Sequence, residues 1–176
     1  MDKKEQFFEM LFINADLKIN ICNILQINGQ EFSQWVGELN TARAEEITVI
    51  KRVRSLYHNK AAKSNFSFAN FNEFYKWFKE QYSKQNGKCY YCGTEEKVIA
   101  SLCEKKYQYR KRSNRGNHLE VERRDAKGNS YNKENCVLAC YFCNNDKSDI
   151  FSEDEYFQYL KNRKEFFEKE YQSIIK

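Results

Sequence analysis

Apolar side chains recur at three- and four-residue intervals through the first 60 residues, which is the spacing of one face of an α-helix. One such stripe lies within residues 7–12, and a second lies within residues 47–57. The pattern therefore predicts helices over residues 2–60. We expect a break near Asn28, which precedes a glycine, and a helix start at an N-cap formed by Thr41.

A stripe of aromatic residues follows at the same helical spacing between Phe71 and Tyr82, and it ends before Asn86-Gly87. Such a stripe is typical of a buried helix face. The polar stretch at residues 59–68 separates it from the first helices and is expected to be a connector.

The second half of the chain mixes strand and helix signals. The alternation of Leu119-Glu-Val-Glu-Arg123 predicts a strand, and Ser152 with Glu155 forms a capping box that opens a final helix. The remaining expected elements are a helix over 94–103, an extended segment over 136–140 and a short helix over 141–148. The fold class is therefore α+β and mostly α, with a helical N-terminal arm and a long C-terminal helix. We expect three regions, at residues 1–69, 70–150 and 151–176.

The composition adds that this is a soluble globular protein, with 41% hydrophobic and 31% charged residues among 176. Those fractions exclude a disordered tail, a collagen-like fibre and a membrane-spanning chain. Charged residues interrupt the first 20 positions and leave no apolar run of a signal peptide. We therefore expect a cytoplasmic protein with no membrane association.

The net charge of +5 is concentrated in one place. Residues 104–115 contain six bases and one acid, while the other 24 bases and 24 acids balance. A basic patch with interleaved tyrosines indicates a polyanionic partner, although a solvated helix end would look the same. The bases are Lys105, Lys106, Arg110, Lys111, Arg112 and Arg115.

Four of the seven cysteines form two C-x-x-C pairs, Cys89 with Cys92 and Cys140 with Cys143. In a chain without a secretory signal, such pairs indicate a metal site and not disulfides. Four thiolates around one tetrahedral ion make a closed structural zinc site. Cys136 is an alternative ligand to Cys140, with a less suitable spacing to Cys143.

The cysteine pairs belong to a longer pattern that resembles the HNH endonuclease family in its four-cysteine, zinc-containing branch. The pattern is C-Y-Y-C-G at 89–93, then L-E-V-E-R-R-D at 119–125, then E-N-C-V-L-A-C-Y-F-C-N-N-D-K at 134–147. The resemblance covers about residues 87–150. It implies a zinc-stapled ββα unit around a catalytic divalent metal ion.

The resemblance also implies site residues. Glu122 matches the acid that binds the catalytic metal, Asn135 the middle asparagine, and Asn144 the last ligand position. Lys147 matches a basic position near the phosphate. Carboxylate and amide oxygens suit Mg²⁺ or Mn²⁺.

Arg123 occupies the position of the general-base histidine of the family. An arginine stays protonated and cannot accept a proton from water, but it can hold a phosphate. His118 is a poor substitute because it lies too far along the strand from Glu122, and His58 is expected on the surface. Glu120 shares a strand face with Glu122, so it is either a second carboxylate of the site or an exposed strand residue.

Together these features predict a metal-dependent endonuclease that hydrolyses phosphodiester bonds in nucleic acid, with DNA the favoured substrate. Arg124 and the basic run would follow the phosphate backbone. The resemblance further implies a role in restriction or phage defence. The alternative is a catalytically silent zinc module that binds nucleic acid, or one whose N-terminal region docks a partner protein.

Overall fold

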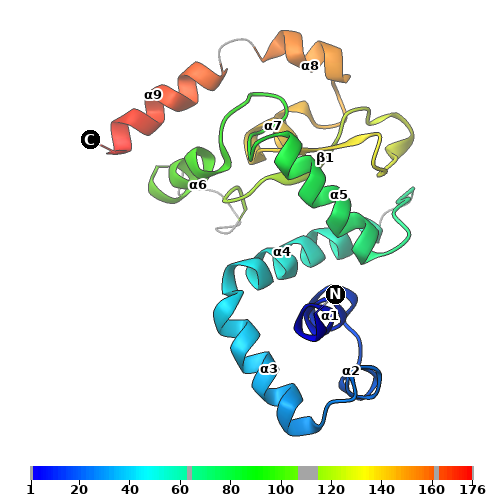
Figure 1. Ribbon diagram of the computed structural model, residues 1–176. Coiled ribbons are helices and arrows are strands. Elements are labelled where there is room, and N and C mark those ends of the chain that lie inside the picture. The colour runs from blue at the N-terminus through cyan, green and yellow to red at the C-terminus, as the bar shows by residue number, and fades with distance from the viewer. Residues whose placement is uncertain (1, 63–64, 107–114, 161–162, 176) are drawn as a thin grey trace. The chain divides into compact units, whose positions relative to one another are not determined.

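The computed structural model describes residues 2–62, 65–106, 115–160 and 163–175 (Figure 1). The fold is α+β and mostly helical, as predicted, with a two-stranded sheet. In chain order the elements are α1 (Lys3–Phe8), η1 (Glu9–Asn14), α2 (Lys18–Leu25), α3 (Gly29–Ala42), α4 (Ala44–Ala61), α5 (Phe71–Lys84), α6 (Glu96–Lys105), β1 (Glu120–Arg123), η2 (Lys127–Asn129), β2 (Cys136–Ala139), α7 (Tyr141–Lys147), α8 (Glu153–Tyr159) and α9 (Arg163–Ile175).

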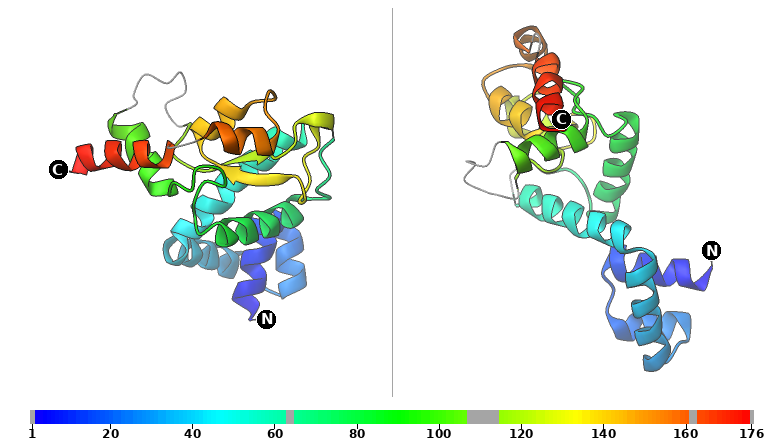
Figure 2. Two further views of the ribbon diagram at one scale, coloured as in Figure 1. Left: turned by 90° about the horizontal axis from the view of Figure 1, so that it is seen from above. Right: turned by 90° about the vertical axis from the view of Figure 1, so that its left-hand side faces the viewer.

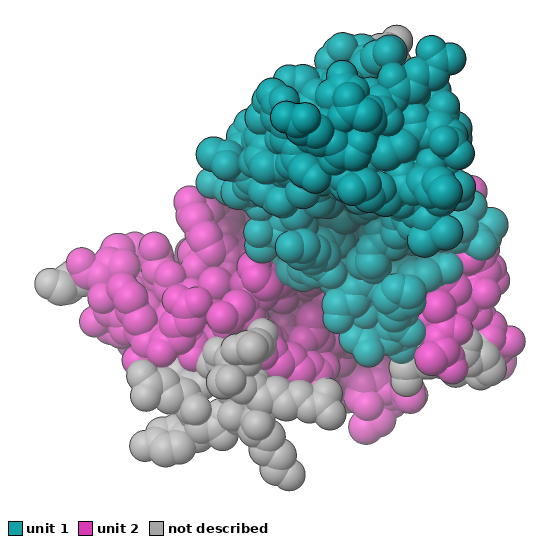
Figure 3. All heavy atoms as spheres, turned by 90° about the horizontal axis from the view of Figure 1, so that it is seen from below, with its two compact units in different colours: residues 1–59, 69–76 teal, residues 60–68, 77–176 magenta. Residues whose placement is uncertain are grey.

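The chain divides into two compact units, which Figure 3 distinguishes by colour. The first contains residues 1–59 and 69–76, and the second contains residues 60–68 and 77–176. No helix among the described residues is both long and apolar enough to cross a membrane.

The first unit is a small helical assembly with an aromatic core. Phe7 is fully buried, and its ring meets those of Phe32 and Trp35 edge-on at centroid distances of 5.1 and 5.3 Å. Ile50 and Val53, from the second predicted stripe, are also buried. The predicted apolar stripes therefore form this core.

The helix breaks in this unit lie at particular backbone positions. Asn28 forms a capping box with Glu31 at the start of α3, which confirms the predicted break. Ala15 and Gln26 end the preceding helices in the left-handed conformation. The predicted N-cap at Thr41 was wrong, because α3 continues through that residue and the chain bends at Arg43.

The second unit contains the antiparallel strands β1 and β2. Their register pairs Glu120 with Ala139 and Arg123 with Cys136. The edge of β2 that faces away from β1 is also paired. The Gln85 carboxamide, at the end of α5, both donates to and accepts from the backbone of Leu138, at 2.7 and 3.0 Å.

The connector between α4 and α5 is bound to the loop between the strands. Phe66 forms a parallel bridge with Tyr131, and the Ser67 amide donates to the Tyr131 carbonyl at 2.9 Å. The segment expected to be a simple connector is therefore part of the second unit.

The C-terminal region differs from the single long helix expected from the sequence. It forms two helices, α8 and α9, on either side of residues 161–162. The capping box of Ser152 and Glu155 is present at the start of α8. Helix α9 packs along α6, as both views of Figure 2 show. Phe157, predicted on the buried face of one helix, is 43% exposed because that face does not continue past α8.

Candidate active site and metal centre

Four buried cysteine thiols come together in the second unit, as the sequence predicted. The sulfurs of Cys89, Cys92, Cys140 and Cys143 all lie within 4.8 Å of one another, and those of Cys92 and Cys140 are 3.9 Å apart. Zinc–sulfur bonds of about 2.3 Å in a tetrahedron place neighbouring sulfurs about 3.8 Å apart. The donor set and its spacing therefore fit one tetrahedrally coordinated metal ion.

The chain forms this cluster from a tight turn and a helix start. The turn after Cys89 closes with a bond from the Gly93 amide to the Cys89 carbonyl, and Gly93 has a φ of +67°, which favours glycine. Cys140 is the N-cap of α7, and its sulfur accepts from the Cys143 amide. The Cys140 amide in turn donates to the sulfur of Cys89 at 3.2 Å. These backbone donors orient the sulfurs before any ion binds.

Cys136 lies outside the cluster among the residues that the structure describes. It pairs with Arg123 across the sheet, and burial raises the pKa of its thiol to about 12. The alternative ligand set containing Cys136 is therefore not the one that the fold assembles.

The second group of polar residues lies between β1 and α7. Glu120 and Glu122 share one face of β1, and α7 presents Asn144 and Lys147 to them from positions three residues apart. The side-chain amide of Asn144 donates from Nδ2 to the Glu120 carboxylate, and the Lys147 Nζ lies 3.6 Å from Oε1 of Glu122. The sequence predicted that Glu122 and Asn144 would bind one metal ion together. In this structure Asn144 contacts Glu120 instead, and Glu122 lies beside Lys147.

Glu122 is the most perturbed carboxylate at this site. It is only 6% exposed, and burial raises its pKa to about 7 despite the nearby cationic charges of Lys147 and Lys60. Lys147 is fully buried, and its separation from Glu122 exceeds a hydrogen-bond length. The neighbouring cations therefore offset only part of the cost of burying the negative charge of Glu122. A site of this kind suits an additional cation.

Glu120 is held differently. Arg115 binds it with two parallel hydrogen bonds, at 2.8 and 2.9 Å, in addition to the bond from Asn144. Glu120 is therefore a fixed carboxylate of the site and not the exposed strand residue that the sequence left open.

Arg123 follows Glu122 and alternates to the other face of β1, but its positive charge still acts on Glu122, where it joins Lys147 and Lys60 in opposing the effect of burial on the pKa. It is 8% exposed, its Nη2 is 2.5 Å from Oδ1 of Asp149, and its guanidinium lies 4.9 Å from the centroid of the Tyr131 ring. Asp149 is 72% exposed, so an incoming phosphate could replace it as the partner of Arg123.

Lys60 is a site residue that the sequence analysis missed. Its Nζ lies 4.7 Å from the Tyr131 ring centroid, and its charge lowers the pKa of Glu122. Lys60 lies in the last turn of α4, far from Glu122 in the sequence, and no local motif signals it.

Asn135 organises the loop after β1. Its Oδ1 accepts from the Asp125 amide at 2.9 Å, and its Nδ2 donates to the carbonyls of Asp125 and Ser130 at 2.8 and 2.9 Å. All of these contacts are with the backbone, so Asn135 fixes the loop in this conformation.

Of the predicted phosphate-binding bases that the structure describes, all but Lys105 lie beside an acid. Lys106 forms an ion pair with Glu170, Arg115 with Glu120, and Arg124 with Glu153. Lys105 is exposed, and Lys147 is buried beside Glu122. Arg110, Lys111 and Arg112 lie outside the described residues.

The two histidines lie apart from the carboxylates. Nδ1 of His118 is 3.3 Å from Oε1 of Glu96 on α6, and His58 is exposed on α4. Neither contacts Glu120 or Glu122 among the described residues.

Comparison with known proteins finds one related structure. The chain is similar to the solved structure of the rare-cutting HNH restriction endonuclease PacI, with 25% identity, a TM-score of 0.49, and coverage of 68% of this chain and 77% of that chain. No protein-family model and no curated protein matches the chain.

The cysteine cluster predicts one tightly bound zinc ion per chain. Cys143→Ser should lose the metal and unfold the second unit, because the binding energy of a structural zinc contributes directly to folding. Cys136→Ser removes a buried thiol outside the cluster and should keep the metal. Elemental analysis of both variants and the wild type, purified without chelator, measures this. An equal zinc content in Cys143→Ser would contradict the ligand assignment.

The raised pKa of Glu122 predicts a pH-dependent stability in the absence of added divalent ions. An unfolded glutamate titrates near pH 4.3 and the folded one near 7, so the folded state binds the extra proton between those values. Stability should therefore fall as the pH rises towards 7, by about 1.4 kcal/mol per pH unit. Glu122→Gln should remove this slope in urea unfolding between pH 5.5 and 8, and Glu165→Gln, at an exposed position of α9, should retain it.

Proposed function

We propose that this chain is a metal-dependent endonuclease of the HNH type that hydrolyses phosphodiester bonds, with DNA as the favoured substrate. The observation that carries the proposal is the pairing of Glu120 and Glu122 with α7 inside a ββα unit closed by four thiols. This arrangement places two carboxylates and an amide at one site, which is the donor set of a hard divalent cation.

The catalytic cation would be held by Glu122 and Asn144, with Glu120 beside them. Two features support this fit. The Glu122 carboxylate is buried with a raised pKa, and the Asn144 amide already lies within hydrogen-bond reach of a carboxylate. When bound, Mg²⁺ or Mn²⁺ supplies a water of lowered pKa and stabilises negative charge on the phosphate. Asn135 would keep the loop after β1 in place around the site.

Arg123 would bind the scissile phosphate. Its guanidinium is oriented by Asp149 and by the Tyr131 ring. The arginine exchanges a carboxylate partner for a phosphate partner, and it does not act on the water. Charge-assisted contacts of this kind stabilise the developing charge of the transition state.

A second candidate function is a silent zinc module that binds nucleic acid without cutting it. The observation in its favour is the absence, among the described residues, of a histidine at the carboxylates, since His118 is bound to Glu96. The two functions differ in whether a divalent ion supports cleavage.

The decisive experiment replaces Glu122. In the presence of Mg²⁺ or Mn²⁺ the wild type should nick plasmid DNA, and Glu122→Gln should lower the rate at least about 100-fold, because it removes a charged metal ligand. Glu165→Gln is the matched control and should cut at the wild-type rate. Full activity in Glu122→Gln would place the active site elsewhere, and an inactive wild type with intact zinc would favour the silent module.

Arg123 tests the mechanism within the active enzyme. Arg123→Ala should lower the cleavage rate about 10- to 100-fold, the value of a charge-assisted hydrogen bond, while calorimetry still detects Mn²⁺ binding. Arg123→His introduces a general base, which is typically worth about 10²- to 10⁴-fold. If arginine works on the phosphate, Arg123→His should be slower than the wild type. A faster Arg123→His would show that the natural enzyme lacks its base.

A further inference from the structure

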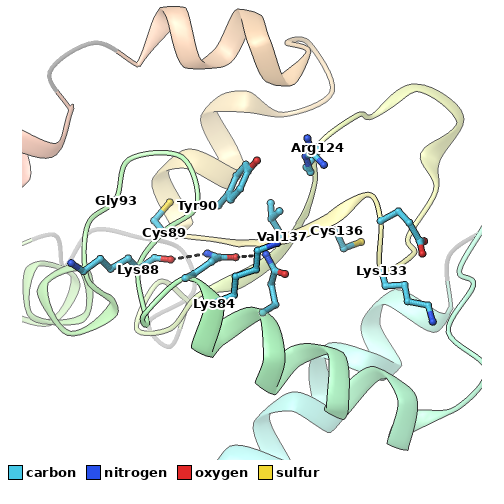
Figure 4. A pocket seen from close by; sticks show the side chains of 12 residues that line it. Lys84, Lys88, Cys89, Tyr90, Gly93, Arg124, Lys133, Cys136 and Val137 are labelled. Atoms are coloured by element: carbon cyan, nitrogen blue, oxygen red, sulfur yellow. Dashed lines mark hydrogen bonds between the residues drawn. The ribbon is translucent and has the colours of Figure 1, made fainter.

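A basic groove lies at the edge of β2 that faces away from β1. Its volume is about 400 Å³, and four segments line it: the end of α5, the turn that contains Cys89, the residue Arg124 after β1, and the loop that leads into β2 (Figure 4). All of its lining residues belong to the second unit. The groove is separate from the face of β1 that carries Glu120 and Glu122.

Positive charge dominates the lining of the groove. The lining contains one carboxylate, that of Glu134, and four basic side chains, those of Lys84, Lys88, Lys133 and Arg124. Glu153 neutralises Arg124 through two bonds, at 2.7 and 2.6 Å. Among the described residues, no carboxylate oxygen lies within 4 Å of the amine of Lys84 or Lys88. Lys84 and Lys88 therefore leave the lining of the groove with a net positive charge.

The groove has a fixed floor and one aromatic wall. Gln85 bridges Lys88 and Leu138 through its carboxamide, at 2.7 Å to each carbonyl, and so ties the end of α5 to β2. The Tyr90 amide donates to the same Leu138 carbonyl at 2.9 Å. Tyr90 itself is half-buried, and the Arg124 guanidinium lies 6.0 Å from its ring centroid. This floor is pre-organised, so a ligand would not have to order it.

The amines are distributed along the groove. Figure 4 shows Lys88 at one end and Lys133 at the other, with Lys84 between them. A single phosphate would need its cations gathered at one point. Cations spaced along a groove, with an aromatic ring on one wall, suit a chain of phosphates with bases or sugars between them.

We propose that this groove binds the sugar–phosphate backbone of a nucleic-acid strand, as a second binding surface outside the predicted basic run. The proposal for the groove rests on the proposed nuclease function for one thing only, the class of the ligand, which is nucleic acid. The lysines would contact phosphates without reading the sequence, and they would increase affinity for all sequences alike.

The test compares two triple variants of equal charge. One combines Lys84→Gln, Lys88→Gln and Lys133→Gln, and the other combines Lys51→Gln, Lys76→Gln and Lys169→Gln, which are exposed lysines outside the groove. Fluorescence anisotropy measures binding of a labelled duplex and a labelled single strand over a range of salt concentrations, without added Mg²⁺ or Mn²⁺. Zinc content and circular dichroism verify that both variants are folded.

The groove variant should bind at least tenfold more weakly at low salt, and its slope of log K against log salt should be shallower by about 2 to 3. Each lost phosphate contact reduces the slope by about 0.7 on a single strand and about 0.9 on a duplex. The control variant should keep a slope within about 1 of the wild type. Equal slopes in the two variants would overturn the proposal. A groove variant that loses binding of inorganic phosphate or a mononucleotide, but not of the oligonucleotides, would also overturn it.

The two proposals fail in different ways. Cleavage by the wild type with an unchanged slope in the groove variant would reject the groove and leave the nuclease. A changed slope without cleavage in any divalent ion would reject the nuclease and leave the groove.

Discussion

Four thiols within 4.8 Å of one another, all buried, form the cluster on which the second unit depends. The sheet beside them has two strands of four residues each, and an isolated two-stranded sheet is at best marginally stable in water. The cluster joins the turn at Cys89 to the first turn of α7, which follows β2 directly. A shared metal ion would therefore convert a weak hairpin and a seven-residue helix into one rigid unit.

The carboxylate site depends on the position of α7, which the cysteine cluster fixes relative to the strands. Cys143 lies in the first turn of α7, so the next residues on the same helix fall at fixed positions over β1. Asn144 meets Glu120, and Lys147 meets Glu122 one turn later. Burying an acid and an amine 3.6 Å apart contributes little stability, since desolvation offsets their attraction. Under the proposed function, a bound cation would account for an acid that is buried at this cost.

The sequence was sufficient for the local parts of this structure and insufficient for the long-range ones. Apolar periodicity located most helices, strand alternation located β1, and cysteine spacing identified the four thiols that the fold brings together. Each of these signals is contained in a short stretch of chain. Lys60 could not be found in this way, because it lies in the last turn of α4 and reaches the site only through its contact with Tyr131, 71 positions further along the chain.

The same limit explains the misjudged contacts. Periodicity placed Phe157 on one long helix, but the chain forms α8 and α9 as separate helices, and Phe157 is left exposed while Phe167 is buried. Glu122 and Asn144 occupy motif positions, yet their present partners are set by the offset of α7 along β1, which spacing in sequence does not encode. Contacts between side chains of different helices and strands can therefore be known only from the three-dimensional fold.

Charge shows this most clearly. Counted along the chain, the bases of residues 104–115 are the obvious surface for a polyanion. In the fold, Lys106 and Arg115 already hold acids, and so does Arg124. An ion-paired base contributes less to phosphate binding, because a new contact must first displace its carboxylate. The lysines of the basic groove are dispersed in the sequence and form no motif, but the fold gathers them at one edge, where the lining contains one acid, Glu134. For a polyanion, the charge left uncompensated by the fold matters more than the charge that is dense in the sequence.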